Sequence, residues 1–480
     1  MKRVVIIGGG IAGLATAYSL REHGAVAGSP GFEVVLLEKK DRVGGNIRTE
    51  RVDGFIVEGG PDCFISEKPW AMALCKRIGL EEKLLPTNDE LRKTYVLSRG
   101  RLHELPEGVI LMIPTKIIPL VTSSLISFPG KIRMGLELFI PKRKEKSDET
   151  LGDFVRRRLG REVLDKIAEP LVAGIHAGDP ETMSVRASFP KFVQLEEDYG
   201  SLIRGMLKRM ASFKKSARAK PRGEGGKTTM FMTLRDGMGE FIERLESLIK
   251  GFENTTVRTG TAVKGVSKKG GKFLIEIEGG EALEADSVII AAPAYVASKV
   301  LEGLDHGLSQ KLLEIPYAST ATVSIAFKKK DLKRPLDGFG FVVPRKEKRR
   351  IMASTWTSVK FDNRAPGDSV LIRCFIGGSK NRELLSLSDA EMVNIVREEL
   401  SDIMGIEAEP IFARVYRWIN SMPQYTVGHE ERVRAIEEGA QAHPGLFITG
   451  SAYHGIGIAD SVRCAEVTAK KALHFIKNPS

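Results

Sequence analysis

The apolar positions of the N-terminal region follow two different periods. Residues 3–7 (RVVII) form an almost continuous apolar run, typical of a buried parallel strand. In LATAYSLREHG (14–24) the apolar residues recur at helical spacing, and FEVVLLEKK (32–40) returns to a continuous run that ends in charge. The pattern predicts a strand, a helix and a second strand. This is the beginning of an α/β fold built on a parallel, Rossmann-like sheet.

The turn between the first strand and the helix contains Gly8, Gly10 and Gly13 in the spacing GxGxxG. The first glycine permits a tight turn, the second lets the backbone approach a pyrophosphate, and the third lets the helix pack on the strand. The helix N-terminus then offers N–H groups to the phosphates. Glu38 ends the second strand and is placed to bond ribose hydroxyls. We interpret residues 25–31 as a surface insertion, which explains why this acidic residue comes slightly later in the sequence than the motif usually places it.

Two further glycine-rich stretches follow the acidic end of the second strand, DRVGGNIRT (41–49) and GFIVEGGPDCF (54–64). FAD extends further from its adenine than NAD does, so it needs additional backbone cradles. The sequence therefore favours FAD. Because no second GxGxxG for a nicotinamide follows, we expect the electron acceptor to be oxygen, a quinone or a protein.

The middle of the chain predicts helices and a loop. Residues 148–180 are largely helical in pattern, with Thr150 as the N-cap. Residues 105–140 are rich in Ile, Leu and Pro and indicate an apolar helical lobe, which is either buried core or a peripheral membrane or substrate-entry surface. Residues 211–229 are rich in Lys, Gly and Ser and predict a mobile basic loop.

The second half of the chain predicts a return to the nucleotide domain and a second sheet. A helix is expected at 233–250, and Ser388 opens an amphipathic helix over 388–405. Strands over 318–376 predict a second sheet. The short strands expected to rejoin the nucleotide domain are 261–269, 272–279, 286–294 and 447–450.

Composition narrows the class of protein. The 480 residues include 42% hydrophobic and 28% charged residues, which is ordinary for a globular protein. The net charge of +12 comes from separate basic clusters, which indicate solvated surface or attraction to an anionic substrate or membrane rather than nucleic acid. The four cysteines have no metal or disulfide spacing, so we expect no metal site and a cytoplasmic location. No apolar run reaches the roughly 18 residues of a membrane span.

Motifs spread along the chain resemble those of the flavin-dependent protoporphyrinogen and coproporphyrinogen oxidases of the haem pathway, within the amine-oxidase-like flavoproteins. The more specific elements are LVAGIHAGDPETMSVRASFP (171–190) and RWINSMPQYTVGH (417–429). The remaining motifs are GGGIAGL (8–14), LLEKKDRVGGNIRT (36–49), VEGGPDCF (57–64), DGFGFVVP (337–344) and GSAYHGIGIADSV (450–462).

The resemblance implies a discontinuous FAD domain with an inserted mixed-sheet substrate domain and a helical lobe. The expected FAD-binding domain is 1–83, 228–296 and 411–480, the substrate domain is 84–104 and 297–410, and the lobe is 105–227. The implied FAD contacts are Gly8, Gly9, Gly10, Ile11, Ala12, Gly13, Glu38, Lys39, Asn46, Gly60, Pro61, Asp62, Cys63, Val263, Trp418, Ile456, Gly457 and Ile458.

The resemblance also gives the C-terminal tail a role. Gly455 and Gly457 let the backbone approach the isoalloxazine closely. Asp460 or Ser461 is expected to cap a final helix. The N-terminus of that helix would direct its positive dipole towards the flavin N1–C2 edge.

The implied reaction is three two-electron dehydrogenations of a porphyrinogen, with oxygen reduced to hydrogen peroxide. No triad or carboxylate pair in the sequence demands an acid–base pair, so no catalytic residue is assigned. His176 and His454 are candidate bases, each with a structural role as the alternative.

A propionate of the implied substrate needs a cation, for which Arg92 is the candidate and Lys93, Arg99 and Arg101 compete. Ring contacts are expected from Ile175, Phe339 and Phe375. Protoporphyrinogen IX and coproporphyrinogen III both remain open, as does peripheral contact with the cytoplasmic membrane face or handover to the next haem-pathway enzyme. The alternative to this family is another amine-oxidase-like flavoprotein, an amine oxidase or a carotenoid desaturase.

Overall fold

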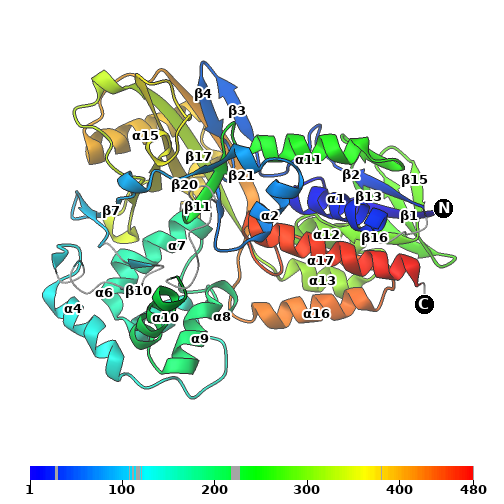
Figure 1. The fold of residues 1–480 in the computed structure, drawn as a ribbon, viewed down its shortest axis with the longest axis horizontal. Coiled ribbons are helices and arrows are strands. Elements are labelled where there is room, and N and C mark those ends of the chain that lie inside the picture. Colours follow the sequence, from blue (N-terminus) through cyan, green and yellow to red (C-terminus); the bar gives the residue numbers. More distant parts are fainter. Residues whose placement is uncertain are drawn as a thin grey trace. The chain divides into compact units, whose positions relative to one another are not determined.

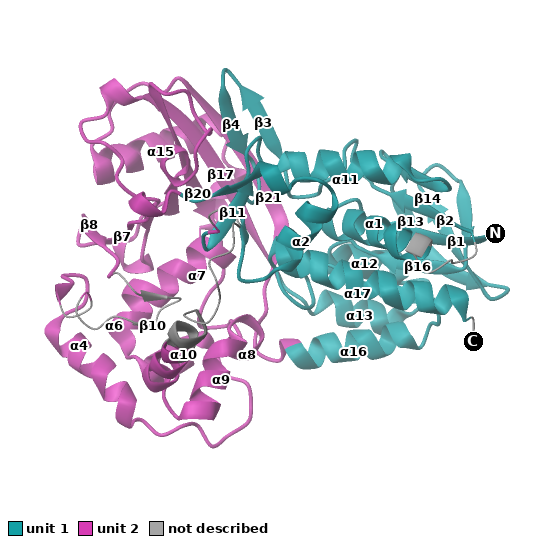
Figure 2. Cartoon of the chain, in the orientation of Figure 1, with its two compact units in different colours: residues 1–87, 229–316, 430–480 teal, residues 88–228, 317–429 magenta. Residues whose placement is uncertain are grey.

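The chain forms two compact units (Figure 2). A computed structural model describes residues 1–26, 31–106, 109–110, 113–114, 119, 122–217, 228–379 and 381–478. Unit 1 consists of residues 1–87, 229–316 and 430–480, and unit 2 consists of residues 88–228 and 317–429. The first unit is therefore built from three chain segments, and it contains both termini.

The bounds of the units differ from the expected domain bounds mainly in two stretches, 297–316 and 411–429. In addition, residues 84–87 belong to unit 1 and residue 228 belongs to unit 2. Residues 297–316 belong to unit 1, where Asp305 caps a helix and accepts a bond from His443 at 2.9 Å. Residues 411–429 belong to unit 2 because their strand pairs with the long strand Tyr317–Lys328. The segment expected as a separate helical lobe shares unit 2 with this sheet.

A parallel sheet organises unit 1. Its strand order is β12–β2–β1–β16–β22, and every neighbouring pair is parallel. The apolar runs predicted as strands form its centre, since strands covered on both faces are continuously apolar. The bounds are β1 (Lys2–Ile7), β2 (Phe32–Leu37), β12 (Thr255–Arg258), β16 (Ser287–Ile290) and β22 (Leu446–Ile448).

Helices cover this sheet, and one apolar core joins the first and last helices of the chain (Figure 1). Leu14, Val462 and Ala469 are among its fully buried members. The helices of unit 1 are α1 (Ile11–Val26), α2 (Trp70–Arg77), α11 (Gly239–Gly251), α12 (Ala294–Leu301), α13 (His306–Leu313), α16 (His429–Gln441, whose first residue is assigned to unit 2) and α17 (Ile458–Lys477).

Three smaller sheets complete unit 1. They are the hairpin β3–β4, the sheet β5–β11–β6 and the meander β13–β14–β15. Their bounds are β3 (Thr49–Val52), β4 (Phe55–Glu58), β5 (Phe64–Ile65), β6 (Leu84–Pro86), β11 (Phe231–Leu234), β13 (Val263–Lys269), β14 (Lys272–Ile277) and β15 (Ala282–Ala285).

A mixed sheet organises unit 2, as the strand patterns of 318–376 predict. Its order is β21–β17–β20–β19–β18–β7–β8, in which only β18 and β7 pair in parallel. The bounds are β7 (Thr94–Ser98), β8 (Arg101–Glu104), β17 (Tyr317–Lys328), β18 (Gly340–Val342), β19 (Ile351–Trp356), β20 (Ser369–Gly377) and β21 (Phe412–Pro423).

Helices pack on both faces of this sheet through separate apolar clusters. Both predicted caps are confirmed: Thr150 caps α5 by accepting from Asp153 N, and Ser388 forms a capping box with Glu391. The helices are α4 (Phe128–Gly135), α5 (Leu151–Arg158), α6 (Arg161–Val163), α7 (Glu169–His176), α8 (Val185–Ser188), α9 (Pro190–Tyr199), α10 (Leu202–Ala217), α14 (Thr357–Lys360) and α15 (Asp389–Met404).

Two predicted segments differ from the structure where it describes them. Residues 211–217, expected in a loop, continue α10, because Lys, Ala, Ser and Phe extend a helix when no Gly or Pro stops it; 218–227 lie outside the described residues. Within 105–140, residues 109–114 contain a short hairpin, β9 (Val109–Ile110) and β10 (Ile113–Pro114), before α4. Much of 107–121 lies outside the described residues.

Short turns of helix complete the list of elements. Among the described residues, no helix is both long and apolar enough to cross a membrane. The turns are η1 (Glu81–Lys83), η2 (Asp89–Leu91), η3 (Leu136–Phe139), the π-type turn η4 (Leu164–Ala168), η5 (Lys329–Asp331), η6 (Arg345–Glu347) and η7 (Arg382–Ser386).

Candidate functional site

The glycine turn between β1 and α1 has one crowded glycine and one that borders open space. A Cβ on Gly13 would lie 1.9 Å from the carbonyl oxygen of Gly8, so this position admits only glycine. A Cβ on Gly10 would meet nothing closer than 4.0 Å, and that neighbour is the Cα of Gly45. Gly13 therefore holds the helix against the turn, whereas Gly10 leaves room beside the backbone for a ligand.

The first turn of α1 supplies hydrogen-bond donors next to this space. The N–H of Leu14 bonds to the carbonyl of Gly10 at 3.0 Å. The N–H groups of Ile11, Ala12 and Gly13 come before this bond, in the first turn of the helix, where the helix itself offers no carbonyl to accept from them. This arrangement suits a pyrophosphate.

Glu38 lies against the same glycine turn. Its Oε2 accepts from Gly9 N at 2.7 Å and its Oε1 accepts from Lys40 N at 2.9 Å, while Lys39 is exposed. The carbonyl of Glu38 accepts from Thr261 N, which places Val263 two residues beyond that contact. The structure thus brings Glu38 and the start of β13 to the glycine turn, although they are far apart in sequence.

The turn that contains Gly44 and Gly45 contacts the first glycine turn directly. Gly44 N donates to Gly9 O at 2.8 Å, and a Cβ on Gly45 would lie 3.1 Å from Gly10 Cα. Arg42 holds this second turn by donating to the carbonyls of residues 43, 45 and 47. Burial lowers the pKa of the Arg42 guanidinium from its ordinary value. The two glycine turns therefore form one continuous backbone surface.

The third glycine stretch extends that surface. A Cβ on Gly60 would lie 1.7 Å from the carbonyl oxygen of Asn46, so Gly60 packs directly on the second turn. Pro61 follows, and the carbonyl of Asp62 accepts from the Thr233 hydroxyl at 2.8 Å. The Cys63 thiol lies 3.2 Å from Asp62 Oδ1 and is half-exposed. Burial, by contrast, raises the pKa of the Cys75 thiol to about 12.

The C-terminal turn joins the same edge of the sheet. Thr449 N donates to Ile290 O at 2.9 Å and so continues the pairing of β22 with β16. The expected cap was wrong: α17 begins at Ile458, with Gly457 as N-cap and no side-chain cap. Asp460 lies inside the first turn, and its carboxylate bonds to Lys68 at 2.5 Å instead of capping the helix.

The candidate bases both have structural surroundings. His454 pairs with Glu437 through Nε2 at 2.8 Å on the surface of unit 1. His176 ends α7, its carbonyl accepts from Gln424, and its ring packs edge-on against Phe189. Both histidines therefore make structural contacts, and a role of either one as a base stays a prediction.

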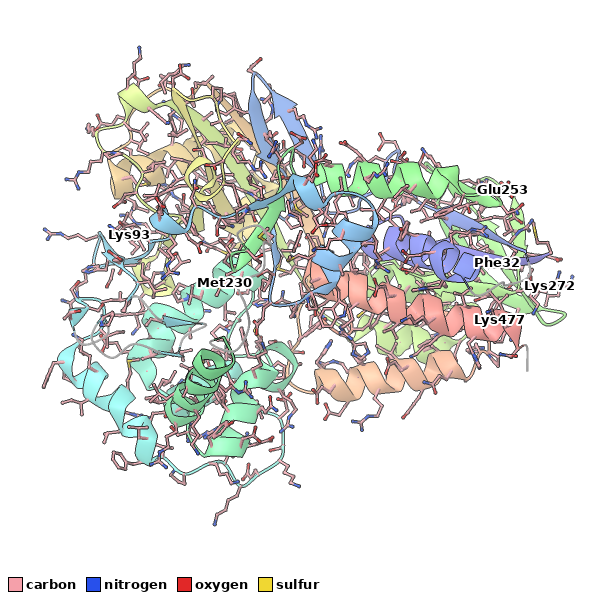
Figure 3. The ribbon with its side chains drawn as sticks, in the orientation of Figure 1. Phe32, Lys93, Met230, Glu253, Lys272 and Lys477 are labelled. Atoms are coloured by element: carbon pink, nitrogen blue, oxygen red, sulfur yellow. The ribbon has the colours of Figure 1, made fainter. Side chains whose placement is uncertain are left out.

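In unit 2, the candidate substrate cations fall into two groups. Arg92 and Lys93 precede β7 and are exposed (Figure 3 labels Lys93). Arg99 and Arg101 lie at the opposite end of the β7–β8 hairpin, about 16 Å away by strand length. Lys93 is already engaged by Asp337 at 3.3 Å. The structure therefore does not bring all four cations to one carboxylate.

The candidate ring contacts also divide. A Cβ on Gly174 of α7 would lie 3.5 Å from Ala353, whose register partner on β20 is Phe375. Ile175, the neighbour of Gly174 on α7, is 55% exposed, whereas Phe375 packs against the apolar cluster that α7 shares with this sheet. Phe339 instead lies just before β18, where its N–H donates to Lys93 O at 2.7 Å.

Comparison with known proteins identifies the fold. A model described as flavin containing amine oxidoreductase matches residues 11–473. The chain belongs to this family of flavoproteins.

Individual members of the flavin-containing amine oxidoreductase family match the whole chain. A coproporphyrinogen III oxidase of Bacillus subtilis is 38% identical over 99% of this chain and 98% of its own length. One of Staphylococcus aureus is 34% identical over 98% of this chain and 99% of its own. The crystal structure of a protein assigned as a protoporphyrinogen oxidase from Exiguobacterium sp. 255-15 superposes with a TM-score of 0.84 at 32% identity, covering 98% and 99% of the two chains.

The residues present fit the FAD that this family uses. The expected contacts of unit 1 all lie along the glycine turns, the end of β2, the start of β13 and the C-terminal turn; the remaining expected contact, Trp418, belongs to β21 of unit 2. A Cβ on Gly450 would meet no atom within 4 Å. Among the described residues, the buried Thr449 hydroxyl has no hydrogen-bond partner, which leaves a donor at this edge for the cofactor.

Sequence reasoning did not single out Thr449 and Lys68, two residues next to the expected cofactor contacts. Thr449 has a signal that could have found it, because it directly follows a parallel strand, where ligands of open α/β sheets bind. Lys68 has none, since its partner Asp460 is remote in sequence and no motif connects them. Among the described residues, no group of three His, Cys, Asp or Glu side chains could hold a metal ion.

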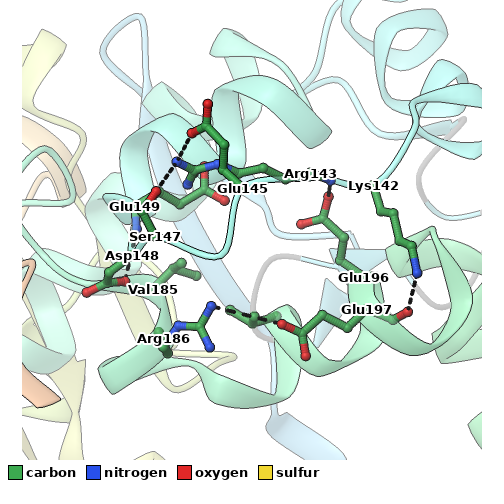
Figure 4. A pocket seen from close by; sticks show the side chains of 11 residues that line it. Lys142, Arg143, Glu145, Ser147, Asp148, Glu149, Val185, Arg186, Glu196 and Glu197 are labelled. Atoms are coloured by element: carbon green, nitrogen blue, oxygen red, sulfur yellow. Dashed lines mark hydrogen bonds and ion pairs between the residues drawn. The ribbon is translucent and has the colours of Figure 1, made fainter.

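A pocket in unit 2 has a different character (Figure 4). Arg143 N donates to Glu196, Lys142 donates to the carbonyl of Glu197, and Arg186 lies 4.0 Å from Glu197. The lining is mainly charged and these charges pair with one another. It contains none of the candidate substrate residues, so we do not assign it to the flavoprotein reaction. Its lining residues are Lys142, Arg143, Glu145, Ser147, Asp148, Glu149, Val185, Arg186, Val193, Glu196 and Glu197.

Proposed function

We propose that this chain oxidises a porphyrinogen to the porphyrin in haem biosynthesis, using FAD and molecular oxygen. The observation that carries the proposal is the match of nearly the whole chain, at 38% and 34% identity, to two proteins named coproporphyrinogen III oxidase. The FAD-type cradle of unit 1 supports it. Coproporphyrinogen III is accordingly the substrate we propose, with protoporphyrinogen IX as the alternative.

In this proposal, different segments of unit 1 bind different parts of FAD. The α1 N-terminus and Gly10 bind the pyrophosphate, Glu38 binds the ribose, and the C-terminal turn lies along the flavin. Bound FAD would supply the two-electron acceptor for three dehydrogenations, each of which removes one hydride and one proton from the porphyrinogen, and oxygen would reoxidise the flavin to give hydrogen peroxide.

Unit 2 supplies the proposed substrate contacts. Ile175 and Phe375 offer apolar surface to a macrocycle, and Phe339 and Arg92 lie near the start of β7. Because aromatisation of the macrocycle drives the reaction, the protein needs chiefly to orient the ring and exclude water, and no residue has to act as a strong base. The pairing of His454 with Glu437 and the edge-on packing of the His176 ring against Phe189 agree with this requirement.

The test is a side-by-side assay of the purified protein. We expect bound flavin in the visible spectrum and porphyrin fluorescence that rises faster with coproporphyrinogen III than with protoporphyrinogen IX. Absence of flavin would reject the cofactor site, and flavin without porphyrin from either substrate would reject the proposed reaction. A faster rate with protoporphyrinogen IX would replace the substrate but keep the reaction class.

Replacing Arg92 should weaken substrate binding. If its guanidinium bonds a propionate, Arg92→Ala removes a charge-assisted hydrogen bond of about 1.5–3 kcal/mol, which raises KM by roughly 10- to 100-fold. The matched control is Lys93→Ala, because Lys93 is engaged by Asp337. Steady-state kinetics with the preferred porphyrinogen measures both, and an unchanged KM for Arg92→Ala would reject the contact.

We further propose a cytoplasmic protein that contacts the membrane face through an apolar stripe on α4 and η3. Phe128, Ile132, Leu136 and Phe139 recur at intervals of four, four and three residues, so they share one helical face. All four are exposed, Phe128 by 75% and Phe139 by 77%. Exposed lysines at 142, 144 and 146 follow and suit anionic lipids.

Polar substitutions on this stripe should release the protein from lipid. We expect the wild type to sediment with phosphatidylglycerol vesicles and Phe128→Ser/Phe139→Ser to remain in the supernatant, with flavin content unchanged. The control Leu207→Ser changes an exposed apolar residue of α10 in the same unit. If the wild type stays in the supernatant, the stripe is open to a protein partner such as the enzyme that consumes the porphyrin.

A further inference from the structure

An ion pair joins the segment before α2 to the first turn of α17. Lys68 Nζ lies 2.5 Å from Asp460 Oδ2. The aspartate side chain is only 9% exposed, whereas the lysine side chain is 44% exposed. Burying a carboxylate is costly unless it is paired, and Lys68 supplies the partner that compensates for the burial of Asp460.

The C-terminal glycine turn rests directly on this carboxylate. A Cβ on Gly455, where φ is +127°, would lie 2.4 Å from Asp460 Cγ and 2.7 Å from Oδ2. A Cβ on Gly457 would lie 3.5 Å from the same oxygen. The position of the carboxylate therefore determines the path of the backbone through Ile456 and Gly457, two of the proposed flavin contacts.

A second cation, Arg463, also contacts this turn. Arg463 Nη2 donates to the carbonyl of His454 at 2.7 Å, and its guanidinium lies over the Trp70 ring at 5.3 Å. Trp70 is the first residue of α2, two positions after Lys68. The segment Lys68–Trp70 and the beginning of α17 are thus joined by side-chain contacts around the turn.

The pair also decides the charge at the beginning of α17. The uncapped N-terminus carries the positive end of the helix dipole, and an unpaired aspartate in the first turn would oppose it. We propose that Lys68, by neutralising Asp460 and fixing the Gly455–Gly457 turn, stabilises the negative charge that a bound flavin gains on two-electron reduction. Lys68 and Asp460 are then positioning residues, and this inference rests on the proposed FAD site.

The experiment measures the flavin reduction potential and the dissociation constant of FAD in the purified holoprotein. Lys68→Met should weaken binding of reduced FAD roughly tenfold more than binding of oxidised FAD, which lowers the two-electron potential by about 30 mV. Asp460→Asn keeps the lysine and removes the opposing charge, so it should raise the potential. Lys68→Met/Asp460→Asn should return it close to the wild-type value.

The matched control is Lys83→Met, since Lys83 is equally exposed (43%) and pairs with Asp236 at 2.8 Å elsewhere in unit 1. It should leave the potential unchanged. A potential in Lys68→Met that shifts no more than in Lys83→Met would overturn the inference, as would a double variant that stays at the value of Lys68→Met. If Lys68→Met retains no flavin, an unchanged potential in Asp460→Asn overturns it. Failure of the wild type to bind FAD would instead overturn the proposed function.

Discussion

Gly10→Ala should remove FAD from the protein without unfolding it. A methyl group at this position meets nothing closer than 4.0 Å, so the apoprotein has room for it. The same methyl group occupies the space through which the backbone approaches the pyrophosphate. We expect the dissociation constant of FAD to rise about 100-fold, equivalent to ~2.8 kcal/mol. Titration of the apoprotein with FAD and urea unfolding of the apoprotein measure the two effects separately.

Gly13→Ala is the matched comparison, because it places the same methyl group three residues further along. Here the added carbon overlaps the Gly8 carbonyl at 1.9 Å, so the turn or the helix has to move. We expect a loss of about 3 kcal/mol in the unfolding free energy of the apoprotein. Equal destabilisation by the two variants, or normal FAD binding by Gly10→Ala, would contradict the division between a ligand-facing and a packing glycine.

The nucleotide half of the fold could be predicted because its constraints are local. The apolar runs of β1 and β2 can only be strands covered on both faces, and the glycine spacing between them has few geometric solutions. The same holds for the caps at Thr150 and Ser388, whose side chains bond the backbone three residues ahead. These features depend on neighbouring residues, so one sequence suffices to predict them.

The errors arose where distant residues decide the structure. Asp460 was expected to cap α17, but Lys68, remote in sequence, takes its carboxylate and leaves Gly457 as the N-cap. Residues 411–429 were expected in the FAD domain from the family resemblance, whereas the pairing of β21 with β17 places them in unit 2. A pattern of apolar positions cannot reveal which partner a strand or a carboxylate will choose.

The candidate substrate site shows the same limit. From sequence, Arg92 was the candidate for the propionate and Lys93, Arg99 and Arg101 competed with it, since each has the charge that a propionate needs. The structure separates them because Asp337, a residue of a distant loop, engages Lys93 and also accepts from the Tyr95 hydroxyl at 3.0 Å. Burial, followed by that hydrogen bond, raises the pKa of Tyr95 above its ordinary value. Arg92, which directly follows η2, stays the predicted propionate contact.

A buried ion pair in unit 2 is the second feature with a large expected effect. Arg158 and Glu137 are both fully buried and bonded to each other. Arg158 also donates to the carbonyls of Ile140 and Gly200, at 2.9 Å each. Glu137 in turn accepts from the Ser201 hydroxyl at 2.6 Å and from Leu202 N, the first residue of α10, at 2.8 Å. One pair therefore joins η3, α5 and the start of α10.

Arg158→Met should destabilise the protein by about 3–5 kcal/mol, because it leaves the Glu137 carboxylate buried without a countercharge. The control is Arg156→Met on the same helix, whose partners Asp153 and Glu181 are at the surface and whose loss should cost under about 1 kcal/mol. Glu137→Met/Arg158→Met should regain part of the stability, since no lone charge remains buried. It should not regain all of it, because the Ser201 hydroxyl and Leu202 N lose their acceptor at about 1 kcal/mol each. Urea unfolding of the four proteins measures these differences, and equal losses for the two single variants would show that the buried pair contributes no more than a surface one.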